Sequence, residues 1–238
     1  PLLIIPLLPL ILSNYPYGIM LLCFAEIYII ATTGFDILYG YSGQISFATS
    51  AFFGIGAYGS ALLYKHFGIP IALTMILAAV LGCVIGMLFA YPVSKLRFAF
   101  LSLSTISFNH IVHQLITRSP GGITGDFNGM FTGRLSLFGI SFADHTLYFY
   151  YGLFWTVLLV ALKMMLVRSR VGRAFLAIKQ NQHAAEGMGI DSRKYKVYAF
   201  GVYGFYVAFA GSIYGHLVGF ISPETFAQPQ SVLFVIMA

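Results

Sequence analysis

Few residues of this chain could do chemistry, and most of these lie inside long apolar runs. Glu26 and Asp36 are the only acidic residues within such runs, and an ionised carboxylate there is costly unless it is paired or faces water. The deeper Glu26 is therefore a candidate for a solute pathway, whereas Asp36 lies near the end of its run, where it can cap a helix or face water. His110 and His113 would share a helix face, but two histidines supply at most half of a metal site.

The sequence carries no enzyme signature. Residues 54–59 (GIGAYG) have the glycine spacing of a dinucleotide-binding turn, but they lack the strand before it and the acidic residue about 20 positions later. In an apolar helix such glycines fit close helix–helix contact instead. Two glycine series with a spacing of four have the same interpretation: Gly82/Gly86 and Gly211/Gly215/Gly219. Because no hydrolase, metalloprotease or phosphate-loop motif occurs, we expect no catalytic residue, no cofactor and no metal, with any ATP used by a separate chain.

The elements that must position these residues are transmembrane helices. Of the 238 residues, 59% are hydrophobic and 8% are charged, whereas a soluble domain has about 25% charged residues. Since a span needs about 20 mostly apolar residues, the sequence predicts an all-α, polytopic transmembrane helix bundle that forms one domain over 1–238. We expect six complete spans at 17–38, 44–64, 69–91, 98–117, 147–167 and 197–220. Partial spans at 1–12 and 230–238 suggest that neither end of the chain is a natural end.

The charge is concentrated in one stretch. Residues 163–196 contain eight basic and two acidic residues and therefore carry the whole net charge of +6. A short basic segment between apolar runs is typical of the cytoplasmic side, so we expect 163–196 in the cytoplasm and a multi-pass protein in the lipid of the inner (plasma) membrane. We expect Lys163, near the end of its run, to reach the lipid head groups. The rest of the chain has no net charge, and no nucleic acid is expected as a partner.

The stretch 39–46 (YGYSGQIS) is polar and rich in glycine, which indicates a sharp turn or a broken helix. Irregular backbone is tolerated at membrane depth only away from lipid. We therefore name Gln44, Ser46 and Thr49, together with Glu26, as candidates for the solute pathway.

The basic stretch 168–196 has the pattern of one or two short amphipathic helices, with breaks at Asn181 and at Gly187 and Gly189. The residues expected on the apolar faces are Phe175, Ile178, Ala185 and Met188. Such a loop could lie on anionic lipid or present its apolar face to the groove of a partner.

The same loop resembles the coupling loop of ABC-importer membrane subunits, whose general pattern is E-A-A-x-x-x-G. Residues 183–189 read HAAEGMG, with His183 in the place of the first Glu. Residues 169–174 (SRVGRA) are more closely similar to the LivM family of branched-chain amino-acid permeases. Further blocks at 40–46 (GYSGQIS), 51–58 (AFFGIGAY) and 219–224 (GFISPE) agree with that family in the same order. Together the blocks span nearly the whole chain.

The resemblance implies a permease subunit of an ATP-driven importer that moves a small polar solute, most notably branched-chain amino acids, across the inner membrane. It implies four kinds of partner besides lipid: a second, LivH-like permease subunit, two cytoplasmic ATP-binding subunits and an external solute-binding protein. In that family the loop helix fits a groove on the ATPase. The residues expected at this contact are Arg170, Arg173, His183, Ala184, Ala185, Glu186 and Gly189.

Two alternatives stay open at this point. Related permeases handle urea, short amides or aromatic acids, and nothing in the spans chooses among these solutes. A secondary transporter or channel would instead use Glu26, Asp36 and the histidines for ion coupling. The specific loop pattern and the scarcity of charge in the spans favour the importer.

Overall fold

The computed structural model describes residues 9, 16–94, 98–133, 136–137, 140–141 and 145–237. Apart from Pro9, the partial span predicted at 1–12 lies outside the described residues.

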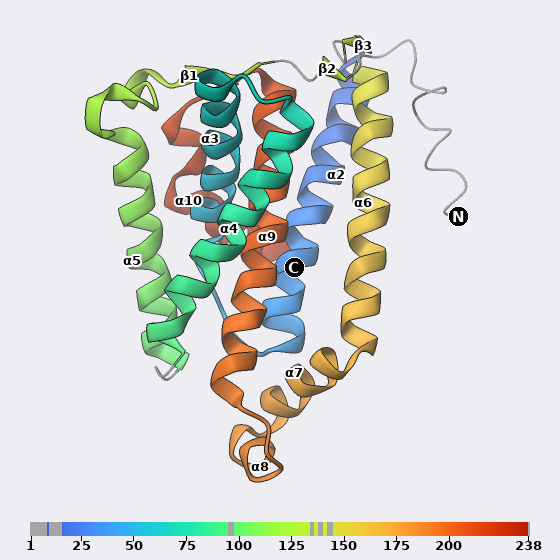
Figure 1. The fold of residues 1–238 in the computed structure, drawn as a ribbon, viewed down its shortest axis with the longest axis vertical. Coiled ribbons are helices and arrows are strands. Elements are labelled where there is room, and N and C mark those ends of the chain that lie inside the picture. The colour runs from blue at the N-terminus through green and yellow to red at the C-terminus, as the bar shows by residue number, and fades with distance from the viewer. Residues whose placement is uncertain are drawn as a thin grey trace.

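The described chain is a bundle of long helices (Figure 1). In chain order the long helices are α2 (Pro16–Asp36), α3 (Thr49–Phe67), α4 (Ile71–Val93), α5 (Phe98–Thr117), α6 (His145–Arg168) and α9 (Ser192–Val218). A five-residue π-helix, Ile37–Tyr41, continues α2, and α10 (Gln228–Met237) lies where the second partial span was expected. The prediction of an all-α helix bundle is confirmed.

Four helical segments of the described chain are long and apolar enough to cross a membrane: Tyr17–Tyr41, Ile71–Val93, His145–Arg168 and Ser192–Val218. Each coincides with a predicted span. The helices at the two other predicted spans, α3 and α5, are present but more polar, so this criterion supports several membrane crossings without settling their number.

Helix α9 lies at the centre of the bundle and packs on α2, α3 and α4. Glycines make these contacts close, as their spacing predicted. A Cβ at Gly82 would lie 2.4 Å from the Cβ of Ala208, and one at Gly211 would lie 2.0 Å from the carbonyl oxygen of Phe53. Because glycine has no side chain, the two helices come close enough for their backbones to touch. Such van der Waals packing stabilises helix association in lipid, where the hydrophobic effect does not drive helices together. Gly219 is an exception to the prediction. Its φ of 78° makes it the left-handed cap of α9, and a Cβ there would have no atom within 4 Å, so it does not mediate a helix contact.

Short elements gather at the two ends of the bundle (Figure 1). At one end, which we call the loop end, α7 (Arg170–Gln180) and α8 (Gln182–Gly187) connect α6 to α9. At the other end, the strand end, β1 (Met130–Phe131) pairs antiparallel with β4 (Phe220–Ile221), and β2 (Ser136–Leu137) pairs with β3 (Ile140–Ser141). The described residues also form three short 3₁₀ turns, at Pro120–Gly122, Asp126–Asn128 and Pro223–Phe226.

Candidate functional site

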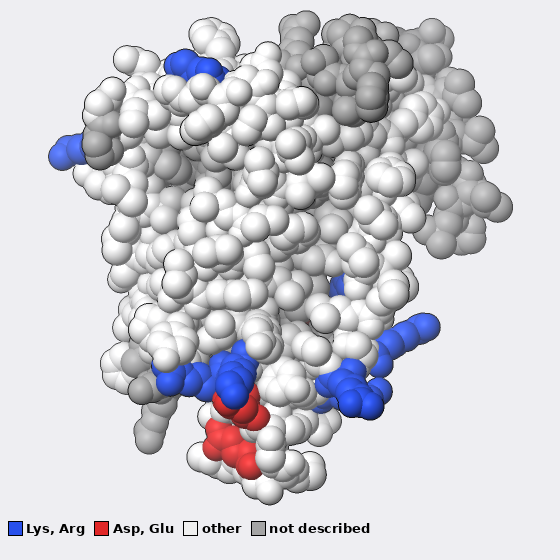
Figure 2. Space-filling view, in the orientation of Figure 1, with Lys and Arg blue, Asp and Glu red and all other residues white. Residues whose placement is uncertain are grey.

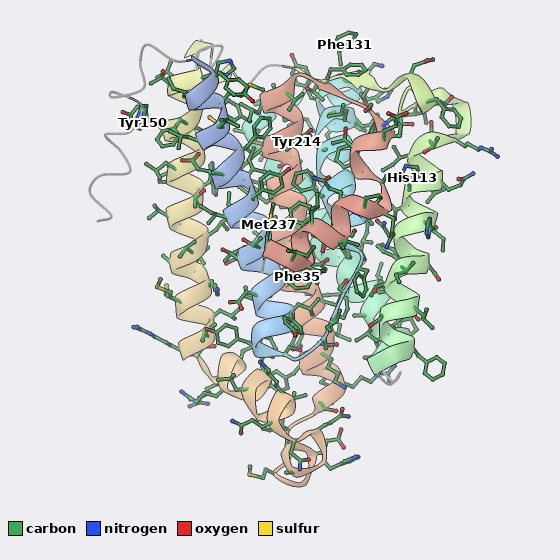
Figure 3. All side chains as sticks on the ribbon, turned by 180° about the vertical axis from the view of Figure 1, so that it is seen from behind. Phe35, His113, Phe131, Tyr150, Tyr214 and Met237 are labelled. Carbon is green, nitrogen blue, oxygen red and sulfur yellow. The ribbon has the colours of Figure 1, made fainter. Side chains whose placement is uncertain are left out.

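The helix break predicted at 39–46 is present, and it places the beginning of α3 inside the bundle. Residues 42–48 are not helical and rise from the loop end toward the middle of the bundle (Figure 3). Within this segment, backbone groups bond to side chains: the N–H of Phe47 donates to Oγ1 of Thr105 at 3.1 Å, and that of Ala48 donates to Oγ of Ser46 at 3.2 Å. The helix therefore begins at Thr49, five residues later than the predicted span 44–64.

Polar side chains of α5 and α10 meet the first turn of α3. The N–H of Ser50 donates to Oγ of Ser231 at 2.9 Å, and the Ser50 hydroxyl donates to Oδ1 of Asn109 at 2.8 Å. Nδ2 of Asn109 in turn donates to Oε1 of Gln228 at 2.5 Å. The first N–H groups of a helix have no partner within the helix. This buried network supplies a partner for the N–H of Ser50 and for its hydroxyl.

The predicted pathway residues on this segment are buried and bonded within the chain. Thr49 and Tyr203 are fully buried, with their side-chain oxygens 2.8 Å apart. Nε2 of Gln44 donates to Oγ of Ser42 at 2.5 Å, and Ser46 is the acceptor described above. In this conformation the three side chains hold the broken segment in place, and their part in a solute pathway stays a prediction.

Glu26 lies in a different contact, between α2 and α6. Its carboxylate occupies the space that a side chain would fill at Gly152, where a Cβ would lie 2.3 Å from Oε2. The side chain is buried, and Oε1 has no hydrogen-bond partner among the described residues. No hydrogen bond or ion pair there joins Glu26 to Gln44, Ser46 or Thr49, so the four predicted pathway residues do not form one cluster.

The loop end is built from two short helices, where the sequence predicted one or two, and each begins at a side-chain cap. Oγ of Ser169 accepts from the N–H of Val171 at the beginning of α7. Asn181 ends α7 and also begins α8, where its Oδ1 accepts from the N–H of Ala184 at 3.1 Å. Side-chain caps of this kind satisfy otherwise free N–H groups, which explains why a short segment outside the bundle keeps two defined helices.

Phe175, Ile178 and Ala185 are buried, as expected for apolar faces, but Met188 is 75% exposed. The prediction for Met188 was therefore wrong, because this residue lies in the turn after α8 instead of on its inner face.

Polar contacts tie α8 to the first turn of α9. Gln182 and Ser192 both donate to Oε1 of Glu186, and Nζ of Lys196 donates to Oε1 of Gln182 at 2.7 Å. The hydroxyl of Ser192, followed by the amide of Gln182, holds the pKa of the Glu186 carboxyl below its ordinary value. The pKa of Asp191 is also lowered, first by the N–H of Lys194, which donates to this N-cap carboxylate. These contacts keep α8 in a fixed position relative to α9.

Helix α7 is tied to the end of α2. Nζ of Lys179 donates to the carbonyl oxygen of Gly40 at 2.6 Å, in the π-helix that leads to the broken segment. One helix away, Nζ of Lys163 on α6 lies 2.5 Å from Oδ2 of Asp36 at the end of α2. The prediction that Lys163 reaches the lipid head groups was therefore wrong, because its ammonium group pairs with a carboxylate of the same chain.

Most of the residues expected to contact an ATPase are exposed: Arg170, Arg173, His183, Ala184, Glu186 and Gly189. Ala185 differs from these six residues. It is 1% exposed, because it lies on the inner face of α8 and supports that helix from within. Basic side chains surround the base of the α7–α8 hairpin, with acidic side chains between them and its tip (Figure 2).

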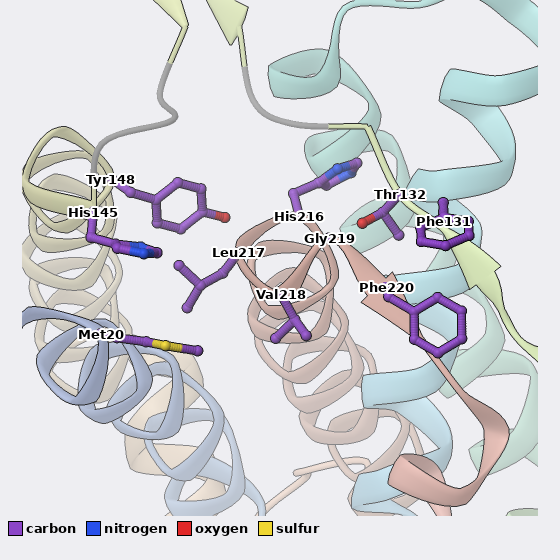
Figure 4. Close-up of a pocket in the computed structure, with 10 residues that line it drawn as sticks. All are labelled: Met20, Phe131, Thr132, His145, Tyr148, His216, Leu217, Val218, Gly219 and Phe220. Carbon is purple, nitrogen blue, oxygen red and sulfur yellow. The ribbon is translucent and has the colours of Figure 1, made fainter. Parts of the chain in front are cut away.

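A cavity of about 510 Å³ opens at the strand end, among α2, α6, α9 and the β1–β4 pair (Figure 4). Its polar lining groups are largely engaged within the chain. Oγ1 of Thr132 donates to the carbonyl oxygen of Gly215 at 2.6 Å. Nδ1 of His216 lies 2.7 Å from the carbonyl oxygen of Gly133, and the hydroxyl of Tyr148 donates to the carbonyl oxygen of Ile213. These bonds fasten the β1 segment and α6 to α9, which supports a structural interpretation of His216.

Sequence reasoning did not select as site residues three residues that bond to Thr49 or Ser50: Asn109, Tyr203 and Ser231. Asn109 lies beside His110 in an apolar run, and its isolated amide side chain was the sequence feature that could have indicated a buried hydrogen bond. Tyr203 and Ser231 gave no local signal, because their partners on α3 lie more than 150 residues away in the chain.

The fold and the capped loop helices define a multi-pass, all-helical membrane protein with an ordered loop outside its bundle. The pattern of the family described as "Branched-chain amino acid transport system / permease component" matches residues 18–238. The chain therefore belongs to this family of transport permeases.

Two relatives are high-affinity branched-chain amino acid transport system permease proteins LivM. The Escherichia coli protein is 30% identical and the Salmonella typhimurium protein 29% identical, each over 89% of this chain. The chain spans just over half, 56%, of the length of each. An autoinducer 2 import system permease protein, LsrC of Yersinia enterocolitica, is 32% identical over 29% of this chain and 19% of its own length. No solved structure matches.

Proposed function

We propose that this chain is the membrane-spanning permease part of an ATP-driven importer for branched-chain amino acids. The relatives named LivM support the solute class. We further propose six spans in the inner membrane, with 163–196 in the cytoplasm. The predicted partners are a LivH-like second permease, two ATP-binding subunits that hydrolyse ATP and an external solute-binding protein.

The observation that carries the proposal is the α7–α8 hairpin. It projects beyond the bundle, exposes small residues on α8, and is bonded to the π-helix that continues α2 through Lys179 and to α9 through Ser192. Lys163 of α6, the helix that leads into the hairpin, pairs in turn with Asp36 at the end of α2. A partner that grips α8 can therefore move α2, α6 and α9 together. A loop that only lay on lipid would not need these fixed contacts.

The coupling role is tested best at Gly187. A Cβ at Gly187 would have no atom within 4 Å, and its φ is not in the left-handed region. Gly189 is less suitable, because its φ of 84° strains any side chain placed there. The matched control is Gln180→Arg, which adds the same charge at an exposed position of α7.

We expect Gly187→Arg to abolish co-purification of the ATP-binding subunits and to reduce ATP-dependent uptake of labelled leucine into vesicles by about tenfold or more. Gln180→Arg should preserve both. Unchanged ATPase binding and uptake in Gly187→Arg would refute the coupling role. Uptake that persists without ATP and stops when the ion gradient is removed would favour an ion-coupled carrier. If urea or an aromatic acid competes with uptake and isoleucine does not, the proposed solute class would be wrong.

A further inference from the structure

Helix α5 exposes polar side chains on a face that the described chain leaves uncovered. Ser107, His110 and Gln114 are exposed, and their spacing of three and four residues places them on one side of the helix. The Ser107 hydroxyl donates to the carbonyl oxygen of Leu103 at 3.1 Å in its own helix. The imidazole of His110 and the carboxamide of Gln114 have no hydrogen-bond partner among the described residues.

The depth of His110 makes this exposure informative. It lies twelve residues after the beginning of α5 at Phe98, which corresponds to about 18 Å along a helix that rises 1.5 Å per residue. In a hydrocarbon core about 30 Å thick, this position is well inside the membrane if α5 crosses it as proposed. A polar group left without a partner in lipid carries a large desolvation cost, so lipid tails are unsuitable neighbours for this face.

Helix α6 shows what a lipid-facing surface of this protein looks like. Its exposed side chains at comparable depth are apolar, with Phe154 and Val157 each more than 60% exposed. A shallow hollow on α6 is lined by Tyr150, Leu153, Phe154, Val157, Leu158 and Ala161. The two helices lie at opposite edges of the bundle (Figure 1). The exposed face of α5 differs from that of α6 because a polar stripe of Ser107, His110 and Gln114 runs beside its exposed apolar residues Phe100, Leu103, Ile111 and Leu115.

A groove of about 400 Å³ runs beside the polar face, between α4 and α5. Its apolar lining includes Phe89, Leu103, Phe108 and Ile111, and Ser107 lies on its wall. Polar donors and acceptors next to an apolar groove match a solute that has both charged ends and an apolar side chain, which is the chemistry of a branched-chain amino acid.

We propose that the α5 face formed by Ser107, His110 and Gln114 lines the water-filled path of the solute, with the adjacent groove receiving its apolar side chain. This rests on the proposed transport function. In this arrangement His110 and Gln114 form hydrogen bonds with the polar ends of the solute, and water satisfies them when the path is empty.

Cysteine accessibility in the assembled transporter tests whether water reaches this face. Cys23→Ala/Cys83→Ala provides the background, because these are the chain's two cysteines. Ser107→Cys, His110→Cys and Gln114→Cys report on the face, Val157→Cys on α6 is the lipid control, and the inward Val112→Cys is the buried control. A membrane-impermeant methanethiosulfonate reagent is the probe, because it reacts with thiolate, which forms in water and not in lipid.

We expect the three cysteines on the α5 face to react at least about tenfold faster than Val157→Cys and Val112→Cys. Reaction as slow as that of the two controls at all three positions would overturn the proposal. The labelling result does not depend on leucine, so it can be distinguished from a failure of the uptake assay.

If leucine is the solute, His110→Ala should also raise the KM of leucine uptake by roughly tenfold. Val157→Ala should leave this KM unchanged. An unchanged KM in His110→Ala would exclude solute binding by His110.

Discussion

Lys163 and Asp36 join the loop-end termini of two long helices, α6 and α2, with Nζ and Oδ2 2.5 Å apart. Oδ1 of Asp36 fills the space where a side chain would stand at Gly40, and the carbonyl oxygen of Gly40 accepts from Lys179 of α7. The segment 42–48 that leads to α3 follows directly. Residues of α6, α7 and α2 therefore contact one another in one small region. A displacement of α7 and α8 would be transmitted through these contacts to the segment 42–48.

The first prediction concerns this ion pair. Lys163→Met leaves the carboxylate of Asp36, which is 35% exposed, without its cation. We expect the free energy of unfolding to fall by about 1–3 kcal/mol, less than for a fully buried pair because water reaches part of the site. Thermal unfolding of the purified complex in detergent provides the measurement. The double variant Lys163→Met/Asp36→Asn should be more stable than the sum of the single effects predicts, and strict additivity would contradict the pairing.

The second prediction uses two glycines of α3 that are one turn apart. A Cβ at Gly56 would lie 1.8 Å from the carbonyl oxygen of Ala208 on α9, whereas one at Gly59 would lie 3.7 Å from Ala78 and Leu81. Gly56→Ala must push two helices apart, so we expect a loss of about 2 kcal/mol or more and a low yield. Gly59→Ala should stay within about 0.5 kcal/mol of the parent. Equal melting temperatures for both variants would argue against the close α3–α9 contact.

The third prediction tests the buried bond between α3 and α9. Tyr203→Phe leaves the hydroxyl of Thr49 without a partner in a dry interior, and we expect a cost of about 1–2 kcal/mol. Thr49→Val added to this variant removes the stranded hydroxyl and should restore part of the stability. Tyr198→Phe, on an exposed face of the same helix, is the control and should have no effect. If the two Tyr variants unfold at the same temperature, the Thr49–Tyr203 bond contributes no stability.

Much of the helical framework could be predicted from the sequence, because apolar length and breaks are local properties. The span predicted at 98–117 coincides with α5, and the breaks at Asn181 and Gly187 separate the loop elements where expected. Partners could not be predicted. Spans such as α4 are apolar on all sides, so periodicity does not show which face packs inward. Likewise, the sequence pattern placed Ala185 on an apolar face and the family resemblance placed it at the ATPase contact, and it is the structure that shows this residue facing into the chain.

The pairing of Lys163 with Asp36 and the network around Asn109 depend on how distant helices are placed side by side. Each of these polar residues has a plausible local role, such as snorkelling to the head groups or capping a helix. Only the packing of the bundle shows that another helix supplies the partner, and this explains why the predicted pathway residues Gln44, Ser46 and Thr49 are bonded within the chain.

The last prediction concerns pH and the position of α8. The hydroxyl of Ser192 and the amide of Gln182 bond the carboxylate of Glu186 and lower its pKa from the ordinary value of 4.5. A carboxyl with a lowered folded pKa contributes its full stability above the ordinary value and loses it as the pH falls through the folded pKa. Helix α8 should therefore keep its contacts with α9 at neutral pH and loosen only below about pH 4.5.

Hydrogen–deuterium exchange of residues 183–188 in the intact complex, corrected for the intrinsic effect of pH, measures this loosening. In the parent we expect protection to stay constant down to about pH 4.5 and to decrease below that pH. In Glu186→Gln protection should be lower at the higher pH and nearly independent of pH, because the amide accepts weaker hydrogen bonds than the carboxylate. Asp191→Asn is the matched control, since that carboxylate caps α9 and makes no contact with α8 among the described residues. A pH dependence that survives in Glu186→Gln but disappears in Asp191→Asn would assign the sensitivity to the α9 cap instead.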